Sequence, residues 1–282
     1  MEAVIAAPAQ NAAVLGENAS FLLLRHSVTS TRLGLDIGAV QVGRNVERNM
    51  RSFELLSVAD LAGINYWDAA QLYTTATHLK GAGTWQRFNA GQWIIATHIF
   101  IPKSDINRNL SHYIRDIATR QCELLACKHI DIMFLAADRV NSIKEIEPQL
   151  AAVVHQGLVR SFGHIAFTTQ QAQIWITQPT VSLLHLQLKE VRLPELMHVF
   201  DQAQCQRLGI VLVLTPALVS CLYQANTTTH QGPSTGPPTP YAEEITVAIM
   251  DLLKAYSCIL KVVYPRANTS SIKMLTERPQ QI

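Results

Sequence analysis

Asp68 and Tyr73 are residues whose types and spacing could carry out proton transfer. They lie in the stretch 63–73, GINYWDAAQLY, where a glycine turn leads into a short apolar strand and Asp68 marks the expected strand end. A carboxylate and a phenol delivered into one loop could exchange a proton with a ligand. The same residues also have a structural interpretation, in which Asp68 caps a helix and Tyr73 is a half-buried packing residue.

The elements that must position these residues are predicted from short apolar runs with little polar alternation. Such runs are typical of strands buried on both faces of a parallel sheet. The predicted strands are Arg32–Ile37, Ile64–Asp68, Trp93–Thr97, Ile130–Leu135, Leu158–His164, Val181–Gln187, Ile210–Leu214 and Ile259–Tyr264.

Helical periodicity lies between these strands. The predicted helices are Val46–Ala62, Asn107–Cys127, Ser142–Gln156, Pro194–Gln206 and Ala242–Tyr256. Ser142 and Glu145 have the spacing of a capping box, and Gly157 stands at the expected C′ position. Strands alternating with helices over about 250 residues predict an α/β fold, a (β/α)8 or TIM barrel. A doubly wound sheet would alternate too, but no GxGxxG motif follows a predicted strand.

The predicted domain organisation is simple. Residues 1–20 are expected to be a flexible N-terminal lead-in, and residues 21–282 a single barrel domain. A mobile loop rich in Pro, Gly and Thr is expected at residues 224–240. Because the chemistry of such barrels lies in the loops after the strands, residues distant in sequence should converge on one mouth.

Composition excludes several classes of protein. Hydrophobic residues make up 48% of the chain and charged residues 16%, which is ample for a core. The net charge of +2 and the scattered Lys and Arg argue against nucleic-acid binding. No apolar run approaches the ~18 residues of a membrane span, and no signal peptide begins the chain. The His and Cys residues lack metal-site spacing, so no metal is expected and the five cysteines should be reduced thiols of a cytoplasmic protein.

Several motifs together resemble the aldo-keto reductase family. GINYWDAAQLY resembles the GxNxxDTAxxY stretch of that family, WIIATHIF its next strand, and GLVRSFGHIAF its "GKVxxxGVS" segment. SIKEIEPQLAAVVHQGLVRSFG is similar to the fungal, aryl-alcohol-dehydrogenase-like branch. The resemblance covers roughly residues 33–275 in the family's order. It implies a (β/α)8 barrel, and because the family's last helix and substrate loop have no counterpart in the sequence, an incomplete C-terminal end is one expectation.

The resemblance also implies a catalytic set. In the family NADPH reduces a carbonyl and a tyrosine supplies the proton, which matches Tyr73, supported by an aspartate that matches Asp68. The family lysine, whose ammonium lowers the pKa of the tyrosine, is replaced by His98. A protonated His98 could pair with Asp68. The family histidine that orients the carbonyl falls at Leu135 or Ala136, so two of four catalytic positions differ.

The cofactor site, like the catalytic set, lacks some of the family's residues. Asp68, Gln187, His164 and Arg266 occupy positions that hold NADP in the family, and Gln187 keeps the family residue. Ile165, next to His164, cannot hydrogen-bond the nicotinamide amide, and Ala267 replaces a second basic or hydroxyl residue after Arg266. We therefore expect NADP binding to be weakened or lost.

Two functions remain open from the sequence. The first is an NADP(H)-dependent oxidoreductase acting on a small-molecule carbonyl or alcohol in fungal secondary metabolism, with Tyr73 as proton donor, Asp68 as its electrostatic partner and His98 in place of the lysine. The second is a redox-inactive barrel, which would be a pseudoenzyme, a ligand binder or a cofactor-free catalyst. A poorly folding product of a decayed gene is a third interpretation. Neither the substrate nor the oligomeric state follows from the residues.

Overall fold

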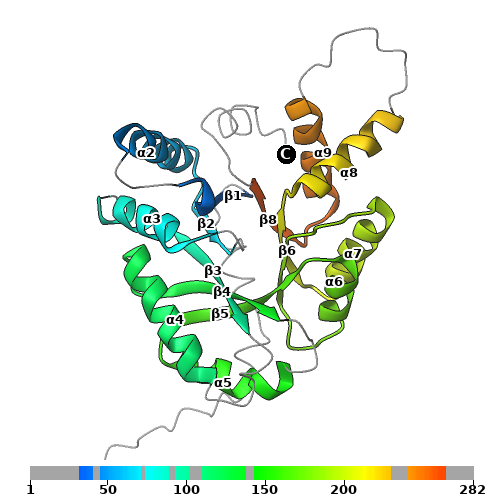
Figure 1. The fold of residues 1–282 in the computed structure, drawn as a ribbon. Helices are drawn as coiled ribbons and strands as arrows, with labels where there is room; N and C mark the ends of the chain where they lie inside the picture. The colour runs from blue at the N-terminus through cyan, green and yellow to red at the C-terminus, as the bar shows by residue number, and fades with distance from the viewer. Residues whose placement is uncertain are drawn as a thin grey trace, which may run out of the picture.

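The sheet is a closed barrel of eight parallel strands in sequential order, β1 to β8 (Figure 1). The computed structural model describes residues 32–40, 45–70, 74–88, 93–101, 110–137, 143–229 and 241–264. Every predicted strand is present, and the (β/α)8 barrel is confirmed with its sheet complete. The strands are β1 (Leu33–Asp36), β2 (Tyr66–Ala69), β3 (Ile94–Ile101), β4 (Ile130–Ala137), β5 (Val159–Ala166), β6 (Leu183–Leu186), β7 (Gly209–Val213) and β8 (Ile259–Tyr264).

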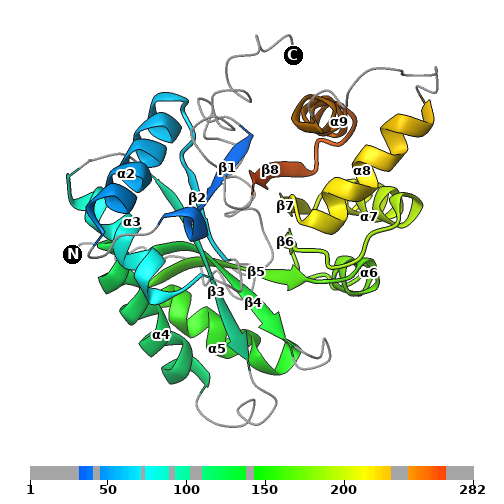
Figure 2. The same cartoon turned by 45° about the horizontal axis from the view of Figure 1, so that its top comes forward.

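Helices lie outside the ring of strands (Figures 1 and 2). They are α2 (Val46–Leu61), α3 (Ala76–Phe88), α4 (Leu110–Leu125), α5 (Ile143–His155), α6 (Thr169–Ile176), α7 (Leu193–Cys205), α8 (Pro216–Thr229) and α9 (Tyr241–Ala255), with a short 3-10 helix, η1 (Ile37–Ala39), after β1. The five predicted helices are confirmed, whereas α3, α6 and α8 were not predicted. The predicted loop at 224–240 is wrong at its start, because α8 continues to Thr229. The rest of that loop, like the lead-in at 1–20, lies outside the described residues.

Local sequence explains where several helices begin and end. Asn45 caps α2 by accepting a hydrogen bond from Arg48 N, and Thr168 caps α6 by accepting one from Gln171 N. Gly63 and Gly157 follow α2 and α5 with φ of 70° and 74°, a conformation that glycine adopts without a steric penalty. The C′ position predicted for Gly157 is thus confirmed.

Side chains alternate between the interior of the barrel and the layer under the helices. The interior is filled by one cluster of buried residues, among them Tyr66, Ala96, Phe134, Ile165 and Val213. A Cβ on Gly163 would lie 2.6 Å from the ring of Phe134, so the glycine makes room for that ring inside the barrel. The alternation decides which polar side chains reach the interior.

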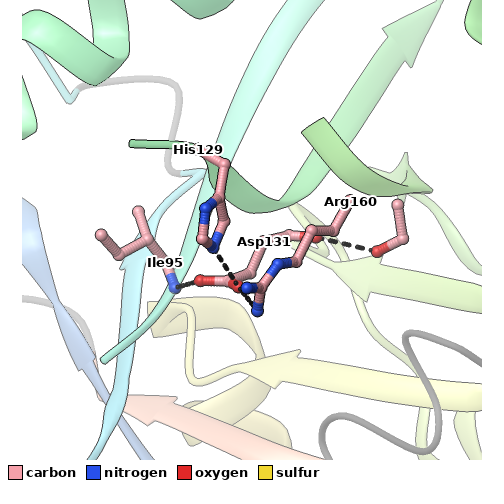
Figure 3. A network of polar contacts seen from close by, with 5 residues as sticks. Ile95, His129, Asp131 and Arg160 are labelled. Atoms are coloured by element: carbon pink, nitrogen blue, oxygen red, sulfur yellow. Dashed lines mark hydrogen bonds and ion pairs between the residues drawn. The ribbon is translucent and has the colours of Figure 1, made fainter. Parts of the chain in front are cut away.

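A hydrogen-bonded network ties three strands together at the amino end of the barrel (Figure 3). Asp131, near the start of β4, accepts hydrogen bonds from Ile95 N of β3 at 2.9 Å and from Arg160 Nη1 of β5 at 3.0 Å. His129 Nε2 lies 3.4 Å from the same carboxylate, and Ser161 donates to the Asp131 carbonyl. This buried carboxylate therefore fixes the relative positions of β3, β4 and β5.

The first and last strands close the barrel. β1 pairs with β8 in parallel, with Leu33 opposite Val262. Just before β1, Arg32 donates hydrogen bonds to Leu253 O at 2.6 Å, to Tyr256 O at 3.2 Å and to Ile259 O. One guanidinium thus binds the end of α9 and the start of β8 to the beginning of the described chain. Among the described helices, none combines the length and apolar character that crossing a membrane requires.

Candidate active site

Three ionisable side chains share the interior face near the carboxyl ends of their strands. Asp68 lies two residues after the interior Tyr66 in β2, and His98 two residues after the interior Ala96 in β3. His185 stands near the end of β6 and packs its ring against Phe134, at 4.9 Å between centroids. Because all the strands are parallel, the three side chains gather at one end of the barrel.

The central contact of the site is a hydrogen bond across the barrel. His185 Nε2 donates to Asp68 Oδ2 at 2.8 Å, and both side chains are 0% exposed. Three strands lie between β2 and β6 in either direction around the closed sheet, so this bond joins opposite walls. Ala70 N donates to the other carboxylate oxygen at 2.9 Å. Asp68 is thus held by the backbone of its own strand and by an imidazole from the far side.

The unbound nitrogen of His185 is also buried. Since the carboxylate accepts, Nε2 carries the proton, and Nδ1 is the remaining polar atom of the ring. Nδ1 is shielded from solvent and has no hydrogen-bond partner in the described part of the chain. The Tyr66 hydroxyl is in the same situation, and burial, together with Asp68, raises its pKa well above the usual value. Tyr66 is therefore a neutral phenol within the interior.

His98 does not pair with Asp68 as the sequence suggested. Its Nδ1 instead donates to the carbonyl of Ala69 at 3.3 Å, while Gln121 Nε2 of α4 holds the His98 carbonyl at 3.2 Å. Burial lowers the pKa of His98, an effect that the Ala69 carbonyl and Asp68 oppose and His185 reinforces. The ring is accordingly neutral at pH 7. The cation that the hypothesis required beside Asp68 is therefore not supplied by His98.

The structure does not bring His164 to this site. The neighbouring Ile165 faces the interior, and the His164 ring stacks instead on Trp175 of α6, with centroids 4.4 Å apart. Burial lowers the pKa of His164 to about 3, so the ring is neutral. Gln187 comes directly after β6, two residues after His185, so alternation places it on the same face as His185. Tyr73 and Arg266 lie outside the described residues.

The structure also distinguishes the two positions considered for the family histidine. Ala136 belongs to the cluster inside the barrel, whereas Leu135 packs in the outer core. The interior position is thus occupied by a methyl group, which cannot orient a carbonyl oxygen. Among the described residues, no group of three or more His, Cys, Asp or Glu side chains could hold a metal ion.

Sequence reasoning missed His185. The available signal was its spacing from Gln187, because residues two apart in a strand share a face. Lys261, in β8, was also missed; it is 1% exposed, and burial followed by the charge of Arg32 lowers its pKa to about 8. The influence of Arg32, which stands just before β1, places Lys261 toward the amino end and away from the site.

The sequence as a whole agrees with this architecture. A model of the aldo/keto reductase family matches residues 35–261. The chain belongs to the aldo/keto reductase family. Membership supports oxidoreductase function, as do the motifs around Asp68. A search of curated protein sequences finds no significant match to the chain.

Solved aldo-keto reductases share the fold at low sequence identity. Aldo-keto reductase AKR11C1 from Bacillus halodurans, in its holo form, is 14% identical and superposes with a TM-score of 0.64 over 90% of this chain and 88% of that one. The glycerol dehydrogenase AKR11B4 from Gluconobacter oxydans has 14% identity and a TM-score of 0.62, with the same coverage. An aldo/keto reductase from Klebsiella pneumoniae, in complex with NADP and acetate, has 11% identity and a TM-score of 0.58 over 89% and 93%.

Proposed function

We propose that the protein is an NADP(H)-dependent oxidoreductase that interconverts a small-molecule alcohol and its carbonyl compound at the carboxyl end of the barrel. The observation that carries this proposal is the position of Asp68. It lies at the family's catalytic strand end, inside the barrel, fixed by Ala70 N and His185. Asp68 is held in place without the family lysine because an imidazole from β6 donates to it.

Among the described residues, Gln187 is the one that we propose for binding the nicotinamide end of the cofactor. Bound NADP(H) would supply or accept a hydride. Gln187 could hold the carboxamide, since it follows His185 on the interior side of β6 and carries both a donor and an acceptor. His164 cannot serve there while its ring stacks on Trp175, and Ile165, which faces the interior, offers no hydrogen bond. Arg266 remains the proposed contact for the 2′-phosphate. We expect this set to bind NADP(H) more weakly than a complete one.

Each site residue then has a proposed role. Tyr73 is the proton donor to a carbonyl oxygen, and Asp68 is its electrostatic partner. His185 is a positioning residue, because it reaches the reaction only through Asp68. His98 occupies the lysine position but, being neutral, does not lower the pKa of Tyr73 as an ammonium would. Turnover of a carbonyl should therefore be slow.

The wider setting is also part of the proposal. The likeness of SIKEIEPQLAAVVHQGLVRSFG to the fungal aryl-alcohol-dehydrogenase-like branch supports a role in fungal secondary metabolism, in the cytoplasm. The proposed partners are small molecules only. The bacterial structures above support the fold, and the NADP in one of them and the name of another agree with a nicotinamide-dependent alcohol or carbonyl reaction.

A fluorescence titration with NADPH tests the proposal. Saturation at micromolar cofactor is the expected result, with weaker binding in Gln187→Leu. The matched control is Gln178→Leu, a change beyond the end of α6 that should leave the affinity unchanged. If the fluorescence shows no saturation up to millimolar NADPH, the proposed function is wrong.

The second candidate is a redox-inactive barrel that uses the same site. It is favoured by three interior features: the neutral His98, the methyl group of Ala136 and the apolar Ile165. Each removes a group that the family uses for proton transfer or cofactor binding. The absence of saturation in the NADPH titration, together with a cooperative thermal unfolding transition, would favour this candidate and exclude a poorly folding product.

A further inference from the structure

Two cysteines meet where helix α4 ends. Cys127 N donates a hydrogen bond to Cys122 O at 3.0 Å, and Ala126 N donates one to Glu123 O at 3.3 Å. Ala126, between the two cysteines, has a left-handed φ of 54°. These features define a Schellman motif, which commonly brings two apolar side chains into contact at the positions that Cys122 and Cys127 occupy. The backbone at the end of the helix therefore brings two thiols together.

The two thiols are in contact but differ in exposure. They hydrogen-bond to each other, and both are free cysteines. Cys122 is 7% exposed and belongs to the outer core. Cys127 is partly exposed and packs both against this core and against the cluster under α2 and α3. A small molecule can thus reach the pair from the side of Cys127.

The hydrogen bond makes the two thiols unequal. The Cys127 thiol donates to the Cys122 sulfur and thereby lowers the pKa of Cys122, an effect that burial and the nearby carboxylates of Asp131 and Glu123 oppose. The pKa of Cys127 is raised, first by this hydrogen bond and then by burial. Because a thiolate, and not a thiol, attacks an oxidant, Cys122 is the nucleophile of the pair and Cys127 carries the proton.

We propose that Cys122 and Cys127 form a modification site, at which a hydroperoxide converts the two thiols into a reversible disulfide across the end of α4. The Cys122 sulfur attacks a peroxide oxygen, so that an S–O bond forms, the O–O bond breaks and the other oxygen takes a proton and leaves as water or an alcohol. Cys127 then gives up its proton, and its sulfur attacks the Cys122 sulfur. The S–S bond forms, the S–O bond breaks and water leaves. Each sulfur has lost one electron, and the peroxide has gained two.

The pair is arranged for the second step as well as for the first. Once Cys122 is a sulfenic acid, the hydrogen bond that raised the pKa of Cys127 is lost, so Cys127 ionises more readily. Its sulfur is already in place, because the backbone bond to Cys122 O holds Cys127 against the last turns of the helix. The disulfide would join α4 to the segment that enters β4, at the amino end of the barrel. The site therefore does not depend on the function proposed for the carboxyl end.

Differential alkylation of the native protein tests this inference. The folded protein is treated with increasing hydrogen peroxide, unfolded in N-ethylmaleimide and digested with trypsin, which releases residues 121–128 as one peptide with both cysteines. We expect this peptide to lose two hydrogens and take up no maleimide, and dithiothreitol to restore two alkylated thiols. Cys205, the exposed cysteine that ends α7, is the internal control and should still take up maleimide at the dose that closes the pair.

Two substitutions of Cys127 test the roles within the pair. Neither Cys127→Ser nor Cys127→Ala can form the disulfide, so Cys122 should take up oxygen instead, as sulfenic and then sulfinic acid. Serine keeps a donor beside the Cys122 sulfur and alanine removes it, so oxygen uptake should be several-fold faster in Cys127→Ser. Cys205→Ser is the matched control and should close the native pair at the same rate as the unchanged protein.

Each outcome decides the inference. A loss of two hydrogens that dithiothreitol reverses, at a peroxide dose that spares Cys205, supports the disulfide. Oxidation of Cys205 while both thiols of the pair still react with maleimide would mean that Cys122 and Cys127 only pack together. Equal oxygen uptake at Cys122 in the two Cys127 variants would refute its activation by the hydrogen bond.

Discussion

Two buried aspartates with histidine neighbours lie at opposite ends of the barrel, and they are compensated in different ways. At the amino end, Asp131 contacts Arg160 and His129, whose side chains are 53% and 30% exposed. At the carboxyl end, Asp68 contacts His185, and neither side chain is exposed. One carboxylate has a permanent cation that is in contact with water, and the other has a fully buried imidazole ring.

This difference separates a carboxylate with an exposed cationic partner from the carboxylate of the proposed site. Asp131 joins three adjacent strands. Because Arg160 is half exposed, solvent screens its attraction to Asp131, and losing that ion pair should cost little free energy of unfolding. Asp68 is hydrogen-bonded to a strand on the opposite wall, where burying a charge costs free energy unless the partner stays in place. The end of the barrel with the proposed site is thus the end whose carboxylate has no solvent-exposed partner.

The largest effect should come from removing the partner of Asp68. His185→Leu leaves the buried carboxylate without its donor, and the free energy of unfolding should fall by about 3–5 kcal/mol, measured by urea denaturation. Adding Asp68→Asn to that variant removes the stranded charge and should recover part of the loss. A fall below about 1 kcal/mol in the single variant would mean that solvent or another group compensates Asp68.

The corresponding change at the amino end should be milder. Asp131→Asn keeps an oxygen that can accept from Ile95 N but loses the charge that binds Arg160. The free energy of unfolding should fall by about 2 kcal/mol in the same urea assay. A loss equal to that of His185→Leu would remove the distinction between the two carboxylates.

His164 is a useful contrast to His185, because it is a buried histidine whose ring stacks on Trp175 instead of bonding to a carboxylate. Its pKa in the folded protein, about 3, lies below the usual 6.5. Between these values the unfolded chain binds more protons, so the free energy of unfolding falls as the pH falls. From pH 6 to pH 5 this contribution is about 1 kcal/mol. His164→Phe keeps the stacking and should lack this component; an unchanged pH dependence in that variant would contradict the assignment.

The smallest effect is expected for Arg160. Its side chain is 53% exposed, so Arg160→Ala should lower the free energy of unfolding by less than about 1 kcal/mol, and by less again in high salt. The salt dependence is measured by repeating the denaturation at low and high sodium chloride. A large and salt-independent loss would show that the amino-end network behaves like the sealed pair.

Much of the fold follows from local pattern, and the exceptions have physical causes. Strand runs are visible because their residues are apolar on both faces, and Gly157 ends a helix because of its backbone freedom. Helix α3 was missed because glycine weakens a helical pattern. The structure shows why glycine is needed there: a Cβ on Gly83 would lie 2.1 Å from the Leu124 carbonyl of α4. Tertiary contact overrides propensity at this position.

The site was only half predictable for a different reason. Asp68 is marked by its place at a strand end, but its partner is 117 residues away, across the barrel. That pairing depends on which residues of β6 face inward, and a shift of one residue exchanges the two faces. The same uncertainty put His164 at the mouth and left Leu135 and Ala136 undecided. Periodicity identifies strands more reliably than it fixes their faces.

The closure of the barrel by Arg32 also sets a time for its folding during synthesis. Arg32 binds the carbonyl of Ile259, which follows it by 227 residues. At about 5–20 residues per second, the ribosome needs on the order of 10–50 seconds to make the intervening chain. Throughout that interval the edge of β1 that pairs with β8 stays open. The guanidinium of Arg32 has none of its three carbonyl partners to bind. The barrel therefore cannot close until β8, the last strand among the described residues, has been synthesised.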